Sequence, residues 1–163
     1  MVAYFFRHPW LFRFVMNFWP PFFFPGIRIK TVSHDYRYAR VDLLWRPWTR
    51  NINNSQYGGS LFSMTDPIIA LMLYGSLDFK RYMIWDKSAD IDFISPGIGR
   101  LTAEFHLEDS DLNRIKQATE TGDAYFPEFD VYVHDQQGEV VCKLTRRLYV
   151  RLKPQYRPAG KQQ

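Results

Sequence analysis

The segment from Ser60 to about Leu77 constrains the fold of this chain more than any other part of the sequence. It is the one long, strongly apolar segment with helical character, and apolar side chains cover nearly all of its sides. A helix that is apolar all round is predicted to lie buried at the centre of its domain. Asp66 stands out within it, because an unpaired carboxylate is costly to bury. Pro67 follows directly and predicts a kink, since proline removes a helical hydrogen bond.

Most of the remaining chain after Gly26 alternates apolar and polar residues with period two, which is typical of strands. A second, polar helix is expected over 109–121, beginning at Ser110 or Asp111 and ending at Gly122. One buried helix among mainly antiparallel strands predicts an α+β domain over 27–153, with one sheet wrapped around the helix. The polar residues 154–163 read as a tail. The expected strands are 27–34 and 36–45, joined as a hairpin near Asp35, followed by 82–95, 101–107, 126–134 and 139–152.

The first 26 residues are rich in aromatic side chains and are interrupted by charges. A short amphipathic helix is predicted over 9–19, and the prolines that follow should end it. We expect it to pack on its own domain or on a dimer partner, with peripheral membrane contact through residues 1–25 as the alternative. No apolar run approaches the ~20 residues of a membrane span. The face expected to pack carries Trp10, Leu11, Phe14, Val15 and Phe18.

Composition excludes several classes of function. The net charge is +4 with a pI near 9.2, and the positive residues are scattered, which suits a phosphate-bearing small ligand or an anionic surface better than nucleic acid. The single cysteine, Cys142, is expected to be a core residue, and a cytoplasmic location is the simplest reading. The scattered histidines argue against a metal site, and no cofactor is expected. They are His8, His34, His106 and His134.

A polar loop from Asn51 leads to Gly58 and Gly59 and then into the apolar helix. Two glycines can adopt φ > 0 and let a ligand approach the backbone closely. The first turn of the helix leaves its N–H groups unpaired, and the positive end of the helix dipole favours negative charge. The pattern predicts a site that binds an anion or a developing oxyanion. Asp66 lies about two turns further along.

Asn51, Gly58, Gly59 and Asp66 together resemble a motif of the hotdog-fold acyl-CoA thioesterases, in the branch similar to phenylacetyl-CoA thioesterase. That branch has an Asn, a short varied run, His-Gly-Gly, and an Asp seven residues beyond the second glycine. Residues 85–93 and the Pro96-Gly97 turn also resemble a hotdog strand, especially in an uncharacterised bacterial subgroup with Asp-Pro after the helix. The resemblance covers about residues 27–152. In this sequence Tyr57 replaces the His of the family.

The resemblance implies hydrolysis of acyl-CoA thioesters at a site shared between the protomers of a dimer, or of a dimer of dimers. The Gly59 N–H would bind the oxyanion, with Gly58 shaping the turn. Asp66 would act as general base or nucleophile, and Asn51 would orient water or the carbonyl. With Tyr57 in place of the His, a non-catalytic binder of acyl chains or acyl-CoA is the alternative function.

Each candidate site residue also has a structural interpretation. Asp66 could be a capping or paired carboxylate in a dimer interface, and Asn51 an ordinary loop residue with a side-chain turn. Tyr57 could line an acyl pocket or donate a phenolic hydrogen bond, with simple packing favoured. Ser60 could contact substrate but is expected to be a residue of the first helical turn. Arg146, with neighbouring basic residues, could meet coenzyme A phosphates, although an exposed strand face is favoured.

Overall fold

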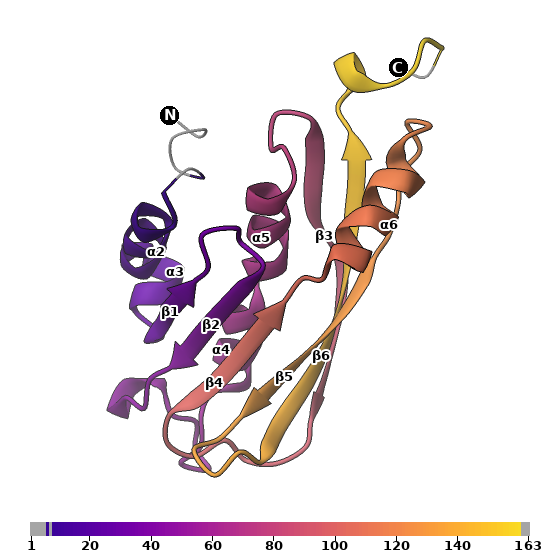
Figure 1. The fold of residues 1–163 in the computed structure, drawn as a ribbon. Coiled ribbons are helices and arrows are strands. Elements are labelled where there is room, and N and C mark those ends of the chain that lie inside the picture. Colours follow the sequence, from indigo (N-terminus) through magenta and orange to yellow (C-terminus); the bar gives the residue numbers. More distant parts are fainter. Residues whose placement is uncertain (1–5, 7, 161–163) are drawn as a thin grey trace.

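The computed structural model describes residue 6 and residues 8–160 (Figure 1). Six strands form one antiparallel sheet in the order β1-β2-β4-β5-β6-β3. The predicted α+β class is confirmed, and so is the hairpin of the first two strands, which pair antiparallel. The strands are β1 (Ile27–Val32), β2 (Tyr38–Leu43), β3 (Tyr82–Phe93), β4 (Leu101–His106), β5 (Glu128–His134) and β6 (Val140–Leu152).

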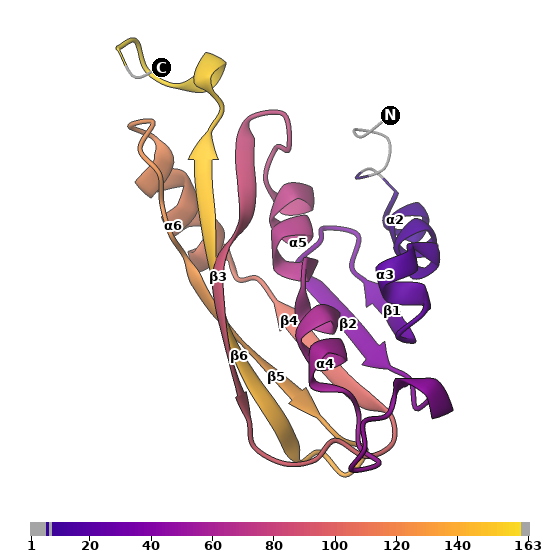
Figure 2. The same ribbon diagram turned by 180° about the vertical axis from the view of Figure 1, so that it is seen from behind.

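Helices α4 and α5 lie against one face of the sheet and form the centre of the core (Figure 2). Their side chains Met64, Met72 and Leu73 are almost completely buried, as the apolar sequence predicted. The helices are α2 (Pro9–Phe18), α3 (Pro20–Phe23), α4 (Gly58–Thr65), α5 (Ile68–Ser76) and α6 (Asp109–Thr119), with short 3-10 helices η1 (Pro47–Thr49) and η2 (Pro154–Tyr156).

The central helix is interrupted where Pro67 predicted a kink. Helix α4 ends at Thr65 and α5 begins at Ile68, so Asp66 and a cis-linked Pro67 form the junction between them. Proline has no N–H to continue the helical hydrogen bonds. Asp66 is therefore at the end of a helix rather than in its middle. Its backbone is extended there, with φ −90° and ψ 133°.

Helix α6 begins at Asp109, as predicted, but its N-cap lies two residues before Ser110 and three before Asp111. Glu108 is the N-cap, and the Asp111 side chain accepts a hydrogen bond of 3.0 Å from the Glu108 N–H. The two form a reciprocal capping box, so the prediction of Ser110 or Asp111 as the cap was wrong. Asp111 takes the other position of the same motif. The helix ends near the predicted Gly122, at Thr119.

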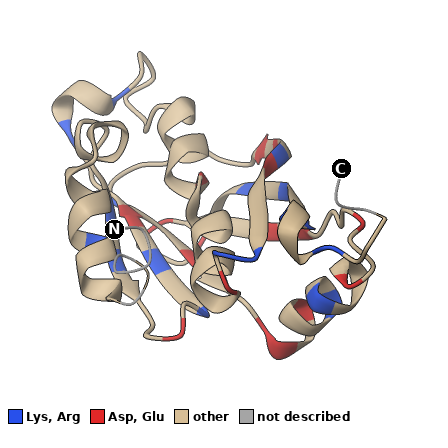
Figure 3. Ribbon diagram, turned by 90° about the horizontal axis from the view of Figure 1, so that it is seen from above, with Lys and Arg blue, Asp and Glu red and all other residues tan. Residues whose placement is uncertain are grey.

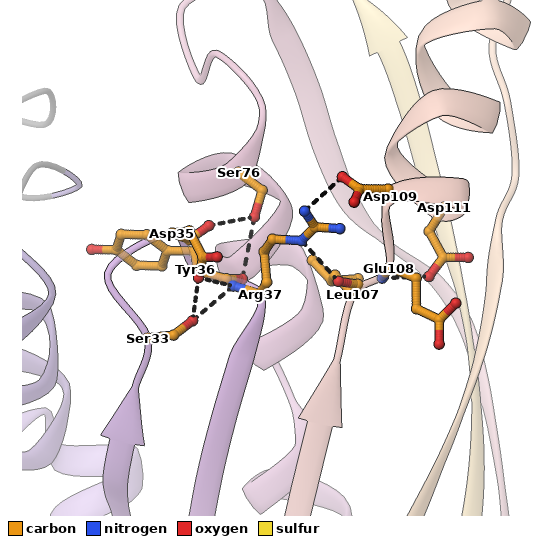
Figure 4. Close-up of polar contacts among 9 residues, drawn as sticks. All are labelled: Ser33, Asp35, Tyr36, Arg37, Ser76, Leu107, Glu108, Asp109 and Asp111. Atoms are coloured by element: carbon orange, nitrogen blue, oxygen red, sulfur yellow. Dashed lines mark hydrogen bonds and ion pairs between the residues drawn. The ribbon is translucent and has the colours of Figure 1, made fainter.

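A polar network holds the β1–β2 turn against α5 and α6 (Figure 4). The Ser76 hydroxyl, at the end of α5, donates to the carbonyl of Asp35 at 3.0 Å. The Arg37 side chain reaches α6, with Nη1 2.6 Å from Oδ1 of Asp109, and donates through Nε to the Leu107 carbonyl at 3.1 Å. The turn thus connects both helices to the β1–β2 hairpin, far from the glycine turn at the start of α4.

The β1 edge of the sheet is closed by α2. The Asn17 side chain accepts from the Ile29 N–H at 2.7 Å and donates to the Ile29 carbonyl at 3.0 Å, and Arg13 donates to the Lys30 carbonyl at 2.9 Å. These are the outward backbone groups of an edge strand, which would otherwise be free to pair with another strand. Side chains of α2 therefore take the place of a further strand.

Helix α2 packs on the domain through the opposite face from the one predicted. Phe12 and Met16 are buried, and the Phe12 ring meets Tyr36 edge to face at 5.6 Å. Trp10, Phe14 and Phe18 are about 60% exposed and Val15 is 44% exposed. The helix packs on its own domain as predicted, but this aromatic face does not, and its packing on a dimer partner stays a prediction. The helix is held on the domain by a narrow contact through two buried side chains. The broader aromatic face remains in contact with solvent.

Candidate active site

The glycine turn at the start of α4 presents two backbone donors. Tyr57 is the N-cap, and its carbonyl accepts from the N–H groups of Ser60 and Leu61. Within the described part of the chain, the N–H groups of Gly58 and Gly59 have no hydrogen-bond acceptor. Both glycines have helical φ values, so the expectation of φ > 0 was wrong. The donors exist because every helix start leaves its first N–H groups unpaired.

Close packing of two aromatic rings explains the glycine pair instead. A Cβ on Gly58 would lie 3.0 Å from the Phe93 ring, and a Cβ on Gly59 would overlap the ring of Tyr57. Tyr57 folds back over the turn, and its side chain is 60% exposed. The Tyr57 hydroxyl has no hydrogen bond among the described residues, so its observed contact is packing. Phe93, from β3, covers the other side of the turn.

Asp66 lies at the far end of α4 in an ion pair with Arg146. Arg146 Nη1 is 2.9 Å from Asp66 Oδ1, and the Asp66 side chain is 45% exposed. The Arg146 Nη2 group also donates to the Phe62 carbonyl and to the Thr65 hydroxyl, each at 2.8 Å. Its guanidinium lies over the Phe62 ring at 4.5 Å. Asp66 is therefore held in one orientation while one side stays open to solvent.

Arg146 is 1% exposed, which contradicts the expectation of an exposed basic strand face at this position. It lies on the inner side of β6, where its alternate neighbours Leu144 and Leu148 are also buried. Its donors are used by Asp66, Thr65 and Phe62. Contact with a coenzyme A phosphate would require it to leave them. The geometry favours a role in positioning Asp66.

A second carboxylate, Asp86 of β3, was not among the predicted site residues. Its Oδ1 atom is 3.8 Å from Arg146 Nη1 and is itself buried without a hydrogen-bond partner in the described chain, whereas the whole side chain is 21% exposed. Burial raises the pKa of Asp86 to about 6 from an ordinary value of 3.8; Arg146 acts in the opposite direction, and the neighbouring Asp66 raises the pKa further. A strongly perturbed carboxyl beside another carboxylate is a common feature of functional sites.

A β-bulge brings Asp86 and Phe93 to the same face of β3. Asp86 pairs with Leu148 and Ser88 with Arg147, so Lys87 is an extra residue. Residues seven apart would normally point to opposite faces, and the extra residue corrects the phase. Unbroken period-two alternation over the predicted strand 82–95 would place Trp85 on the same face as Phe93. That prediction was wrong. Trp85 instead stacks on Tyr149 at 4.0 Å.

The glycine turn and Asp66 lie at opposite ends of α4, and both lie along β3. Phe93 contacts the turn, and Asp86 shares Arg146 with Asp66. The backbone rise from Gly59 to Asp66 is about 10 Å at ~1.5 Å per helical residue. A reacting carbonyl has to lie about 3 Å from both an oxyanion donor and the base or nucleophile. The expectation that the two groups meet across a dimer stays a prediction.

Other predicted site residues have local structural roles. Asn51 Oδ1 accepts from the N–H groups of Asn53 at 2.9 Å and Ser55 at 3.1 Å, and Asn51 Nδ2 donates to the Ser55 hydroxyl. These contacts match the side-chain turn that was the alternative for Asn51. Ser60 is 6% exposed and belongs to the first turn of α4, as expected.

The described residues contain no group of three His, Cys, Asp or Glu side chains placed to hold a metal ion, and no helix long and apolar enough to cross a membrane. A cavity of about 730 Å³ opens elsewhere, where β4 and β5 diverge. It is lined by both core and surface side chains, among them Met72, Phe105 and His106. Asp66, Arg146, Asp86 and the glycine turn do not line this cavity. The cavity is therefore separate from the candidate active site.

Residues 8–150 match the family described as a domain of unknown function, DUF4442. No curated protein is detectably similar to this sequence. Among solved structures, a probable thioesterase of unknown function from Pseudomonas aeruginosa is similar, with a TM-score of 0.78 and 20% identity over 86% of this chain and 93% of that one.

Two further structures show the same architecture at lower identity. The E. coli PaaI protein from the phenylacetic acid degradation operon has a TM-score of 0.57 and 19% identity over 83% of this chain and 86% of that one. A thioesterase from Haemophilus influenzae has a TM-score of 0.62 and 12% identity over 83% and 85%. Likeness at these identities shows the fold. The predicted hotdog fold, of the kind found in thioesterases, is confirmed.

Proposed function

The chain belongs to the DUF4442 family of hotdog-fold proteins, and we propose that it is a thioesterase that hydrolyses acyl-CoA thioesters. One observation carries the proposal. Two glycine N–H groups without an acceptor in the described chain and the oriented carboxylate of Asp66 lie along the same edge strand, about 10 Å apart in helical rise. Thioesterase names among the structural neighbours and the acyl-CoA motif support this class of substrate.

The proposed dimer forms by antiparallel pairing of two β3 strands. In the sheet order β3 is an outer strand. Tyr74 of α5 bonds the outward N–H and carbonyl of Ile84 near its start, and no described helix bonds its edge from Asp86 to Phe93. Pairing about a two-fold axis at Asp90 would set Ile91 opposite Ala89, and Phe93 opposite Asp86 once the bulge at Lys87 is allowed for. These pairs match in face, as paired strand residues must.

This register brings the two halves of the site together. Phe93 lies beside the glycine turn, and Asp86 lies beside Asp66 through Arg146. Pairing Phe93 of one copy with Asp86 of the other would therefore set Asp66 of each copy against the glycine turn of the other. The Gly59 N–H would then bind the thioester oxygen as it becomes an oxyanion. Removal of one such donor costs about 2.7–4 kcal/mol of transition-state stabilisation in well-studied enzymes.

Asp66 would either remove a proton from the attacking water or attack the carbonyl itself. In the first route the water oxygen bonds to the carbonyl carbon, the C–S bond breaks, and the thiolate takes up a proton as the free acid departs. In the second route the Asp66 carboxylate oxygen bonds to the carbonyl carbon, the C–S bond breaks and the thiolate leaves. Water then hydrolyses the acyl anhydride, which releases the acid, restores the Asp66 carboxylate and supplies the proton that the thiolate takes up. Arg146 would position Asp66, while Tyr57 and Phe93 would line the acyl side of the site.

Release of free thiol from a panel of acyl-CoAs tests the activity, and mixed dimers test the shared site. Asp66→Asn removes the base. Gly59→Pro removes the N–H donor at a position where a helix start tolerates proline, and it is made together with Tyr57→Ala to relieve the ring contact. Each variant should be inactive alone, and an equal mixture should recover about a quarter of the activity, since half the dimers contain one intact site of two.

Tyr57→Ala alone is the matched control: it keeps the Gly59 N–H and Asp66 and should therefore still turn over thioesters, with a higher KM because it loses a ring on the acyl side. If no acyl-CoA in the panel is hydrolysed, the proposed enzyme activity is rejected. Activity without recovery in the mixture would keep the enzyme and reject the shared site.

A non-catalytic binder of acyl chains or acyl-CoA is the second candidate function. The observation in its favour is the Tyr57 ring, which packs over Gly59 where the family has a His. Calorimetry with acyl-CoA distinguishes the two candidates. Binding without turnover, with Tyr57→Ala still inactive, would favour the binder.

A further inference from the structure

The aromatic face left exposed by α2 continues across α3 and η1. We call the surface formed by residues 10–30 and 44–50 the N-terminal face. Its rings are in contact with one another: Phe14 lies 4.8 Å from Phe18, and Phe18 stacks on Phe23 at 6.1 Å. The Trp48 indole donates to the Phe24 carbonyl, and Phe24 and Trp48 are 67% and 68% exposed. A contiguous apolar surface of this kind marks an interaction site.

Cations surround these rings, and acids are absent. The sequence has no Asp or Glu in residues 1–34 or 43–65, and Figure 3 shows no acidic residue on α2 or α3. No described carboxylate forms an ion pair with the basic side chains of the face. Several of them lie over its rings instead, as Arg28 does over Phe23 at 5.0 Å and Arg46 over Trp48 at 5.2 Å. The basic side chains are Arg13, Arg28, Lys30, Arg46 and Arg50.

A groove of about 570 Å³ runs between α2 and β1 within this face. Arg13, Arg28 and Lys30 line it together with the rings of Trp10, Phe14 and Phe18. Cations beside aromatic rings suit a ligand with an anionic head and an apolar body. The burial of Arg28 and its closeness to Arg46 lower the pKa of Arg28, which an anion in the groove would reverse.

We propose that the N-terminal face docks on an anionic phospholipid bilayer, with phosphate headgroups in the groove between α2 and β1. Aromatic side chains sit favourably at the headgroup level, and arginine and lysine reach lipid phosphates while their stems stay apolar. A second copy of the chain fits this face poorly, because a two-fold contact would set two acid-free, basic surfaces against each other. The proposal is independent of the thioesterase activity.

Vesicle flotation of the full chain tests this surface. The protein should float with mixed phosphatidylcholine–phosphatidylglycerol vesicles and stay behind with phosphatidylcholine alone. The double variant Phe14→Ser/Phe18→Ser should lose flotation. Arg13→Ala/Lys30→Ala should bind roughly 30-fold more weakly, from about fivefold for each cation near an anionic surface. The matched control Tyr132→Ser/Tyr156→Ser replaces two exposed aromatic residues elsewhere and should bind like the wild type.

Three results would overturn the proposal. The first is equal flotation with both kinds of vesicle, and the second is unchanged flotation of either face variant. The third is a wild-type oligomer that becomes smaller in Phe14→Ser/Phe18→Ser, because that would make the face a contact between protein chains. Should either double variant fail to fold, Lys30→Ala alone decides, with binding weakened about fivefold, since its side chain is exposed.

Discussion

The two edges of the sheet differ in how far helices cover them. At β1, Asn17 and Arg13 of α2 bond the outward backbone groups, so the edge is closed within the chain. At β3, Tyr74 of α5 bonds the outward N–H and carbonyl of Ile84 in the same way, but no described helix bonds the stretch from Asp86 to Phe93, which we call the open edge. Proteins protect open edges because exposed strands associate. The proposed dimer and the proposed site both depend on this open edge.

Blocking the open edge should have the largest effect. Ala89→Lys places a charge in the centre of β3 on the side that faces the helices, which opposes strand pairing. We expect the dimer to dissociate and thioester hydrolysis to fall to the level of Asp66→Asn, because neither half of the site then has its partner. Analytical ultracentrifugation and the thiol-release assay measure the two effects.

The matched control acts on the closed edge. Thr31→Lys adds the same charge to an exposed position of β1 and should leave both the dimer and the activity unchanged. A dimer that survives Ala89→Lys but not Thr31→Lys would reverse the roles assigned to the two edges.

Removing the proposed base tests the chemistry without disturbing the edge. Asp66→Asn should lower kcat by about 10²–10⁴-fold, the usual contribution of general acid–base catalysis. The dimer should remain intact. Asp92→Asn, an exposed carboxylate on β3, serves as control and should stay within about twofold, as surface substitutions usually do. Comparable loss in both variants would argue for a general charge effect.

Removing the side chain that closes the β1 edge should lower the free energy of unfolding without changing the rate of thioester hydrolysis. Asn17→Ala leaves the N–H and carbonyl of Ile29 without their partners, and an unsatisfied group costs about 1–3 kcal/mol in the free energy of unfolding. Hydrolysis per folded molecule should not change. Urea denaturation compares it with Asn113→Ala, an exposed asparagine on α6. Equal stability of the two variants would mean that Asn17 does not protect β1.

Asp86 should make stability depend on pH. The folded state raises its pKa to about 6 from 3.8, so the folded protein holds a proton that the unfolded chain releases. This group therefore lowers the free energy of unfolding as pH rises through that interval. Asp86→Asn removes the effect and should gain stability relative to wild type between about pH 4 and pH 7.5. Denaturation at both pH values measures it; a difference independent of pH would show that Asp86 is not buried this way.

The smallest expected effect refines the register of the open edge. A two-fold axis at Asp90 sets two exposed carboxylates opposite each other, which is destabilising by about 0.2–1 kcal/mol. Asp90→Asn should tighten the dimer by up to about fivefold in sedimentation equilibrium. A weaker dimer would place the two-fold axis at another position along β3. The residues that meet in the mixed dimer would then be assigned from that new strand register.

Local patterns in the sequence were enough for most of the fold. Period-two alternation located the strands, and an apolar segment without a polar side located the central helices, because both signals come from side chains close in sequence. The register of Gly58, Gly59 and Asp66 also follows from chain distance along one helix. The family motif added the expectation that these residues form one site, which stays a prediction.

Features that depend on contacts between distant segments were not predicted. Arg146 reaches Asp66 from eighty residues away. The alternation of β6 did place Arg146 on the apolar face with Leu144 and Leu148, opposite to Arg147, but it could not identify the partner of Arg146. Asp86 was hidden by the bulge at Lys87, which shifts the phase of an otherwise regular alternation. Unbroken alternation put Trp85 and Phe93 on one face and therefore set Asp86 on the other. It left the place of Asp86 unexplained, and that was the available sign of a bulge.

The sequence by itself determined which segments are strands, which are helices, and where a glycine turn precedes an acid on the central helix. Only the tertiary structure decided which face of α2 is buried, which edge of the sheet is open, and which cation orients Asp66. The physical reason is range. Periodicity and capping act over a few residues, whereas the choice between two apolar faces or two sheet edges depends on which surfaces the rest of the chain brings against them.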